Sequence, residues 1–302
     1  TSRGLGDVYK RQNLNLGVVA GSDEAKARLP GAARAREEIM IQYPQIDPVA
    51  LSLGPIAIYW YGLTYVGGLM FAWWLGRQRS RVAGSPISEV QVDDLIFYAA
   101  LGIIAGGRIG YALFYGSGSL LDDPTRLFRL WEGGMSFHGG FLGVVIAVWF
   151  LCRHKNLEFS ALVDFIAPLA PIGLALGRLG NFINQELWGR PTDVPWAMVF
   201  PYDPSGLARH PSQLYQFAME GLLLFFILYW YTRTPLPRWS SGGLFLLGYG
   251  VFRSIAEFFR EPDAHIGFDA LGWLTRGQLL SLPMIVAGLA IIIWAYRRDA
   301  RT

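Results

Sequence analysis

The polar residues best suited to chemistry lie in one short run, LALGRLGNFINQELWGR, from Leu174 to Arg190. This run ends an apolar segment, and it carries charged and amide side chains: Arg178, Asn181, Asn184, Glu186 and Arg190. An ionisable side chain at membrane depth is costly, so it usually faces a bundle interior or a wet cavity and marks a site. The alternative is a helix end whose arginine snorkels to lipid headgroups. We interpret the run as the floor of an active site.

Arg253 and Glu257 form a second candidate pair inside an apolar stretch. They are four residues apart, so they share a helix face and can form an ion pair. One alternative is that the pair only neutralises itself in lipid. Together with Arg108 and Arg178, however, the pair gives three arginines against one glutamate. This excess of positive charge is expected to bind an anion. Arginine makes forked hydrogen bonds to phosphate oxygens, so the predicted ligand is a phospholipid headgroup.

His138 stands where an apolar helix is predicted to begin, between Phe137 and Gly139. A lone histidine is more often structural than catalytic, although its ordinary pKa suits a base at neutral pH. No histidine has a partner at metal-ligand spacing, and there is no HExxH motif, so neither a metal nor an organic cofactor is expected. Asp164 and Glu220 are interpreted as carboxylates that hold helices together.

The composition indicates an integral membrane protein of the all-α class. Of 302 residues, 52% are hydrophobic and 15% aromatic, and apolar runs recur that exceed the roughly 18 residues needed to cross a bilayer. The net charge of +3 comes from dispersed arginines, which gives no indication of nucleic-acid binding. The single cysteine, Cys152, cannot form an internal disulfide and is predicted to be structural.

Seven transmembrane helices are predicted, at residues 56–76, 95–115, 135–152, 161–180, 212–231, 242–259 and 278–296. Arginine and lysine are more frequent in the loops after the odd-numbered spans, which places those loops in the cytoplasm and the active site toward the outer leaflet. The N-terminus is then outside and the C-terminus cytoplasmic. Residues 1–39 are polar and are interpreted as a non-native or disordered leader, and residues 40–302 as the membrane domain.

The motif GRLGNFINQELWG at 177–189 resembles the signature of the bacterial prolipoprotein diacylglyceryl transferases. Further matches follow in that family's order: WYGLTY at 60–65, GGRIGY at 106–111, EGGMSFHGG at 132–140, RHPSQLY at 209–215 and GYGVFRSIAEFFREPD at 248–263. The resemblance covers roughly residues 40–298. The predicted fold is an all-helical bundle of seven spans with a small periplasmic head at about residues 185–211, a segment rich in proline, tryptophan and aspartate.

The resemblance implies an enzyme of bacterial lipoprotein biosynthesis in the cell inner membrane. Such enzymes transfer a diacylglyceryl group from phosphatidylglycerol to the lipobox cysteine thiol of prolipoproteins. The products are a thioether and glycerol phosphate, and the step is the first of lipoprotein maturation. The implied partners are phosphatidylglycerol, a prolipoprotein signal peptide and membrane lipids.

Roles follow from this resemblance and from the chemistry. Arg178 and Arg253 would bind the phosphate, Glu257 would orient Arg253, and His138 would be the leading candidate base for the thiol. The predicted substrate-binding residues are Tyr61, Arg108, Asn181, Glu186, Gly189, Tyr249 and Arg260. The base remains open, because Glu257, Tyr61 or the substrate phosphate could accept the proton instead.

Two other classes of protein compete with this interpretation. A lipid or anion transporter could use the same arginines, but it is expected to show internal repeats or paired broken helices, and the sequence has no such symmetry. A non-catalytic membrane scaffold would explain the glycines but not His138 or the excess of arginine.

Overall fold

The computed structural model describes residues 41–54, 56–114, 124–129, 134–262 and 274–300. The predicted leader, residues 1–39, lies outside them. The described chain divides into two compact units. One contains residues 41–44 and 191–210, and the other contains residues 45–190 and 211–300.

The smaller unit is built on three short strands, β1 (Ile41–Gln42), β4 (Met198–Val199) and β5 (Ala208–Arg209). β1 pairs in parallel with β4, and β4 pairs antiparallel with β5. The Tyr43 ring packs against Phe200, with ring centroids 5.6 Å apart. The predicted head is therefore divided, because residues 185–190 belong to the helical unit and only 191–210 belong to this one.

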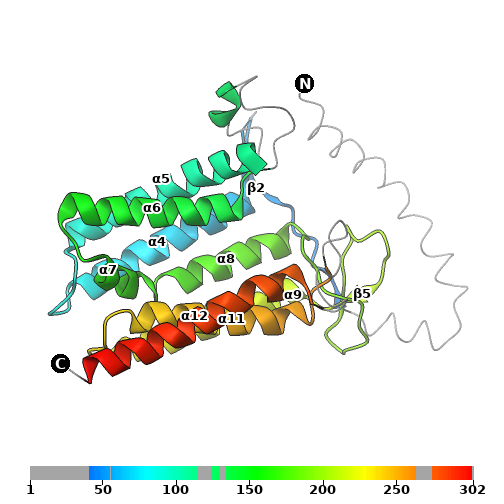
Figure 1. The fold of residues 1–302 in the computed structure, drawn as a ribbon. Helices are drawn as coiled ribbons and strands as arrows, with labels where there is room; N and C mark the ends of the chain where they lie inside the picture. Colours follow the sequence, from blue (N-terminus) through cyan, green and yellow to red (C-terminus); the bar gives the residue numbers. More distant parts are fainter. Residues whose placement is uncertain (1–40, 55, 115–123, 130–133, 263–273, 301–302) are drawn as a thin grey trace, which may run out of the picture. The chain divides into compact units, whose positions relative to one another are not determined.

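The larger unit is helical, and Figure 1 shows its long helices lying side by side. Its helices are α4 (Trp60–Ser80), α5 (Glu89–Phe114), α6 (Phe137–Lys155), α7 (Phe159–Ile166), α8 (Ala170–Ile183), α9 (Ser212–Gln216), η4 (Phe217–Leu223), α10 (Leu224–Tyr231), α11 (Ser240–Glu257) and α12 (Arg276–Asp299), besides a single 3₁₀ turn, η2 (Pro124–Leu127). The closest pairings are α5 with α6, α11 with α12, and α4 with α8. η4 is a π-helix inside the continuous run from α9 to α10.

Every predicted span contains a helix, but two details of the prediction are wrong. Residues 56–59 form strand β3 (Ile56–Tyr59), which pairs antiparallel with β2 (Val49–Leu53), because Gly54 takes a positive φ of 59° and turns the chain between two β-favouring segments. The fourth span is broken into α7 and α8, which meet at a bend of 47°. Pro168 and Pro171 explain the break, since proline cannot donate the helical hydrogen bond. The structure is thus mostly helical, with a few short strands.

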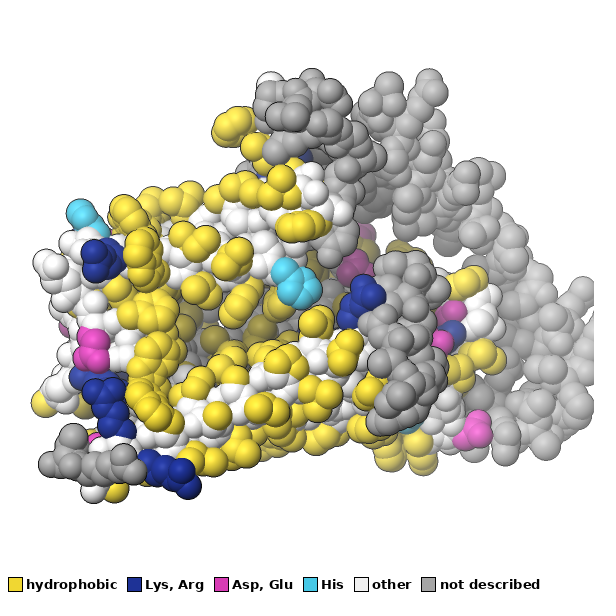
Figure 2. Space-filling view, viewed as in Figure 1, with side chains coloured by type: hydrophobic (Ala, Val, Ile, Leu, Met, Phe, Trp, Pro, Cys, Tyr) yellow, Lys and Arg dark blue, Asp and Glu magenta, His cyan; other side chains and the backbone are white. Residues whose placement is uncertain are grey.

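The helical unit has the length and surface of a membrane protein. Among the described residues, four helical runs are long and apolar enough to cross a bilayer: α5, α6, the run from α9 to α10, and α12. The bent pair of α7 and α8 makes a fifth if it counts as one span. Figure 2 shows hydrophobic side chains over most of the helical face. Met70 is 62% exposed and Phe97 is 66% exposed, which suits contact with lipid.

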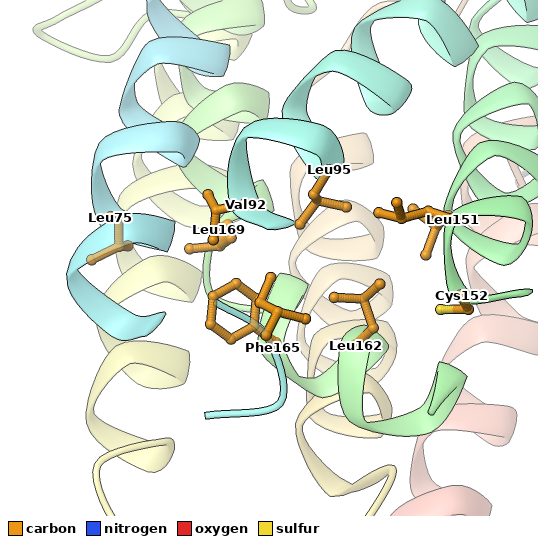
Figure 3. Close-up of a cluster of buried hydrophobic side chains, with 10 residues drawn as sticks. Leu75, Val92, Leu95, Leu151, Cys152, Leu162, Phe165 and Leu169 are labelled. Atoms are coloured by element: carbon orange, nitrogen blue, oxygen red, sulfur yellow. The ribbon is translucent and has the colours of Figure 1, made fainter. Parts of the chain in front are cut away.

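Glycines bring α5 and α6 into close contact. A Cβ on Gly106 would lie 2.3 Å from the carbonyl oxygen of Gly139, and one on Gly143 would lie 2.1 Å from that of Gly102. The small residues of the GGRIG segment at 106–110 therefore serve helix packing. Figure 3 shows the buried core at one end of this layer, where Leu151 of α6 and Leu162 of α7 are fully buried.

Candidate active site

The centre of the candidate site is a buried glutamate between two arginines. Glu220 lies on η4 and is fully buried. Its Oε2 accepts hydrogen bonds from Arg178 of α8, at 3.4 Å from Nε and 3.2 Å from Nη2. Its Oε1 lies 3.5 Å from Nη1 of Arg253, on α11. Three helices thus meet at one carboxylate, and the predicted helix-holding role of Glu220 is confirmed.

Arg253 is also held by Glu257, one helical turn further along α11. The ion pair between them, predicted from their spacing, is present. The same oxygen of Glu257, Oε1, accepts a hydrogen bond of 3.2 Å from Nη1 of Arg260. Glu257 therefore joins two arginines, as Glu220 does.

The other oxygen of Glu257 is held by the N-terminus of α12. Thr275 donates from Oγ1 to Oε2 of Glu257 at 2.6 Å. Thr275 also caps α12, because its Oγ1 accepts from the backbone nitrogen of Gln278 at 3.2 Å in a capping box. Next to it, a Cβ on Gly277 would lie 2.5 Å from the carboxyl carbon of Glu257, so only glycine leaves room there. The positive end of the α12 dipole stabilises this carboxylate.

Gln216 and Tyr249 complete the polar shell around the two arginines. Arg253 donates from Nη1 to Oε1 of Gln216 at 3.1 Å. The Tyr249 side chain lies close enough to Arg178 to interact with its guanidinium group. Tyr249 was predicted as a binding residue, and the structure brings it to the arginines.

A second predicted group lies one turn along α8 from Arg178. Asn181 donates from Nδ2 to Oε2 of Glu186 at 3.3 Å, and Asn184 donates to Oε1 at 3.1 Å. The side chain of Tyr61, on α4, interacts with that of Asn181, and the Tyr61 hydroxyl lies 3.2 Å from that of Tyr65. Tyr61, Asn181 and Glu186 are three of the predicted substrate-binding residues, and the structure places them together.

The segment that follows α8 is fixed to the end of α11. Gly189 and Arg260 form an isolated antiparallel bridge, and the backbone nitrogen of Arg190 donates to the carbonyl of Phe259 at 2.8 Å. The Arg190 side chain donates from Nε to the carbonyl of Arg260 at 3.0 Å. This close backbone approach brings Arg260 beside the signature segment, while the predicted substrate-binding role of Gly189 stays a prediction.

The charges of the arginine cluster do not cancel. Arg178, Arg253 and Arg260 contribute three positive charges and Glu220 and Glu257 two negative ones, so the cluster carries one net positive charge. Arg178 and Arg253 retain partial exposure, with side chains 20% and 12% accessible. Such a cluster can bind an anion and stabilise charge that develops on a leaving oxygen.

His138 and Arg108 lie at the packed α5–α6 pair. His138 is in the first turn of α6, which Ser136 caps by accepting from Gly139 N at 3.2 Å, and it is exposed. Among the described residues His138 makes no hydrogen bond or ion pair; its ring contacts that of Phe137. Arg108 is buried and donates to the carbonyls of Gly134, at 3.2 Å, and Arg129, at 2.8 Å. Arg108 therefore fixes the segment that leads into α6.

Three members of the cluster were not predicted as site residues: Glu220 as a bridge, Gln216 and Thr275. An ionisable residue in an apolar run was a usable signal for Glu220. The signal for Thr275 was a capping pattern, threonine followed three residues later by glutamine. Nothing in the local sequence marks Gln216. Among the described residues, no group of three His, Cys, Asp or Glu side chains is arranged to hold a metal ion.

Comparison with known proteins gives one consistent result. The family model described as prolipoprotein diacylglyceryl transferase matches residues 48–294. A protein of Azotobacter vinelandii named phosphatidylglycerol--prolipoprotein diacylglyceryl transferase is 56% identical over 262 residues, which cover 87% of this chain and 99% of the relative. Proteins with the same name from Ectopseudomonas mendocina and Teredinibacter turnerae are each 55% identical. They cover 86% of this chain, and 98% and 94% of the respective relatives.

Proposed function

Because the chain belongs to the prolipoprotein diacylglyceryl transferase family, we infer that it transfers a diacylglyceryl group from phosphatidylglycerol to a prolipoprotein. We propose that the acceptor is the lipobox cysteine thiol at the end of the signal peptide. The thiolate sulfur forms a bond to the glycerol carbon, the carbon–oxygen bond to phosphate breaks, and glycerol phosphate leaves with the electron pair.

The observation that supports this chemistry best is the pair of arginines held from opposite sides of Glu220. Displacement at carbon leaves a phosphate oxygen that gains negative charge, and positioned donors that strengthen as that charge grows lower the barrier. Arg178 and Arg253 are partly exposed, belong to a cluster with one net positive charge, and come from two different helices. We assign them to the departing phosphate. Glu257 would orient Arg253, and Arg260 would extend the positive wall.

The other site residues have separate proposed roles. Tyr61, Asn181, Glu186 and Tyr249 would position the lipid headgroup beside the arginines, and Gly189 would permit the close approach of the segment that carries Glu186. Arg108 would act through the segment that it fixes ahead of α6. His138 is proposed as the base for the thiol, because it is exposed on the first turn of that helix and an imidazole is the side chain most often used as a general base.

We propose that seven helical spans cross the bacterial inner membrane, with α4, α11 and the bent α7–α8 pair completing the set. The orientation rests on charge. Basic residues gather at one end of the helices, in the last turns of α4, α6 and α12. Since cytoplasmic loops are enriched in these residues, that end would face the cytoplasm. The arginine cluster would then lie toward the periplasmic leaflet.

A reconstituted assay tests the function directly. The purified protein is placed in nanodiscs containing phosphatidylglycerol, together with a lipobox peptide, and the peptide mass is followed. The expected result is a mass gain of one diacylglyceryl group on the cysteine, with no gain on a peptide carrying serine there. No mass gain, or movement of lipid between leaflets without peptide modification, would contradict transferase function and favour a transporter.

A further inference from the structure

The least expected feature of the cluster is that its central carboxylate lies on a π-helix. The run from Ser212 to Tyr231 is α-helical at both ends, but Phe217–Leu223 has the wider π form. π-Helical turns are rare and are frequently found at functional sites, where they redirect side chains. Glu220 lies in the middle of this turn and is fully buried.

Close contact between η4 and α8 brings Glu220 to Arg178. Gly221, the next residue, faces Ala175 of α8, and a Cβ on Gly221 would lie only 2.4 Å from the Ala175 Cβ. Ala175 is three residues before Arg178, so it lies about one helical turn away on the same face. The absent side chain of Gly221 thus allows the approach that lets Glu220 accept from Arg178 at 3.2 Å.

The same turn also holds Arg253. Gln216 and Glu220 are four residues apart, and both contact Nη1 of Arg253. The distance is 3.1 Å from Oε1 of Gln216 and 3.5 Å from Oε1 of Glu220. The orientation of the Arg253 guanidinium group is then fixed, because Glu257 pairs with its other terminal nitrogen, Nη2. A buried carboxylate between two arginines also offsets their mutual repulsion.

We propose that Glu220 is a positioning residue for the transfer reaction. It fixes the spacing and the direction of Arg178 and Arg253, so that both guanidinium groups meet one phosphate. This proposal rests on the proposed function, in which those two arginines bind the departing phosphate. Glu220 itself contacts no substrate. Its effect on the reaction passes through the arginines.

The test is a double-mutant cycle in the peptide assay, with kcat and KM for phosphatidylglycerol measured for each variant. Glu220→Gln keeps the size of the side chain but removes its charge. It should lower kcat by about tenfold to a hundredfold, as misplaced catalytic groups do. KM should stay level or fall, because the cluster gains net positive charge. In the double variant with Arg178→Gln, the fold-decrease in kcat should be smaller than the product of the two single fold-decreases. The difference should exceed about twofold, which is the margin within which independent sites multiply.

Asp164→Asn is the matched control. Asp164 is also a carboxylate that joins two helices, since it accepts from the backbone nitrogens of Trp239 at 2.6 Å and Gly242 at 2.9 Å, at the start of α11. Asp164→Asn should lower thermal stability and leave kcat unchanged. If kcat does fall slightly, the decrease should multiply with that of Arg178→Gln, as expected for independent sites. The proposal would be overturned if Glu220→Gln behaved like this control. That outcome is a wild-type kcat, or a decrease in kcat that simply multiplies with that of Arg178→Gln.

A folding defect is treated separately. If Glu220→Gln does not accumulate in membranes, Glu220→Asp keeps the charge on a side chain shorter by one methylene group. It should accumulate and show reduced kcat. Wild-type kcat in Glu220→Asp, or failure of both variants to accumulate, would assign Glu220 a structural role only. Absence of peptide modification by the wild-type protein would instead contradict the proposed function, so the two failures are distinguishable.

Discussion

Gly221 of η4 lies against Ala175 of α8 so closely that a Cβ on Gly221 would come within 2.4 Å of the Ala175 Cβ. This contact sets the separation of the two helices that carry Glu220 and Arg178. The chemistry of the cluster therefore depends on a position that has no side chain.

Gly221→Ala should reduce turnover without preventing membrane insertion. The added methyl group forces η4 and α8 apart, which costs about 1–3 kcal/mol of overpacking and lengthens the contact between Glu220 and Arg178. The expected loss in peptide modification is about tenfold or more. Gly62→Ala on α4 is the control, because a Cβ there meets nothing within 4 Å. Equal activity in the two variants would mean that the helix separation is not critical.

Arg253→Lys tests shape against charge. Arg253 reaches three side chains, with Nη1 near Gln216 and Glu220 and Nη2 paired with Glu257. A lysine keeps the positive charge but is a single point donor, so activity should fall steeply while the protein still accumulates in the membrane. Arg77→Lys is the control, since Arg77 pairs with Glu89 at 3.2 Å in the basic ends of the helices. Wild-type turnover in Arg253→Lys would contradict forked binding of phosphate.

Arg178 and His138 should have separable effects on the pH profile. Arg178→Gln should lower kcat more than lipid affinity, by about 2–4 kcal/mol in the barrier, at every pH. The deficit of His138→Gln should shrink as pH rises toward the ordinary thiol pKa of about 8.5, where thiolate forms without a base. Both profiles are measured in the same nanodisc preparation.

A His138→Gln deficit that stays constant up to about pH 9, beyond the thiol pKa, would remove His138 from the role of base. His138 would then be a headgroup or structural residue. Glu257 would be the next candidate, although both of its oxygens are engaged by Arg253, Arg260 and Thr275.

In the smaller unit, the ion pair of Asp203 and Arg209 should make the segment 191–210 sensitive to acid. Burial raises the pKa of the Asp203 carboxyl, but hydrogen bonds from Arg209 and Ser205 outweigh it and hold that pKa below its ordinary range. Because the folded pKa is depressed, the stabilisation is complete above the ordinary aspartate pKa of about 3.9 and is lost as pH falls through the folded value.

Hydrogen exchange of the amides in residues 191–210 measures this effect. Asp203→Asn should speed exchange at neutral pH, and the difference from wild type should vanish in acid. A constant difference at all pH values would show that the side chain acts through packing rather than charge.

The spacing of residues along the chain was enough to predict the long helices, one ion pair and several candidate site residues. Apolar runs predicted the positions of the long helices α4, α5, α6, α11 and α12 and of the run from α9 to α10, because a segment that crosses a bilayer must be long and apolar. The Arg253–Glu257 pair followed from a four-residue separation, which one helix fixes alone. Tyr61, Asn181 and Glu186 were identified by family motifs, and the structure places them together.

Tertiary structure decided which charges meet. Glu220 and Arg178 are 42 residues apart, and their contact exists because Gly221 lets two helices approach and a π-turn directs the carboxylate between them. The first residues of the predicted first span became strand β3, because a hairpin partner was available. Such features depend on how far apart two packed elements lie, and that distance cannot be predicted from the spacing of residues along one helix.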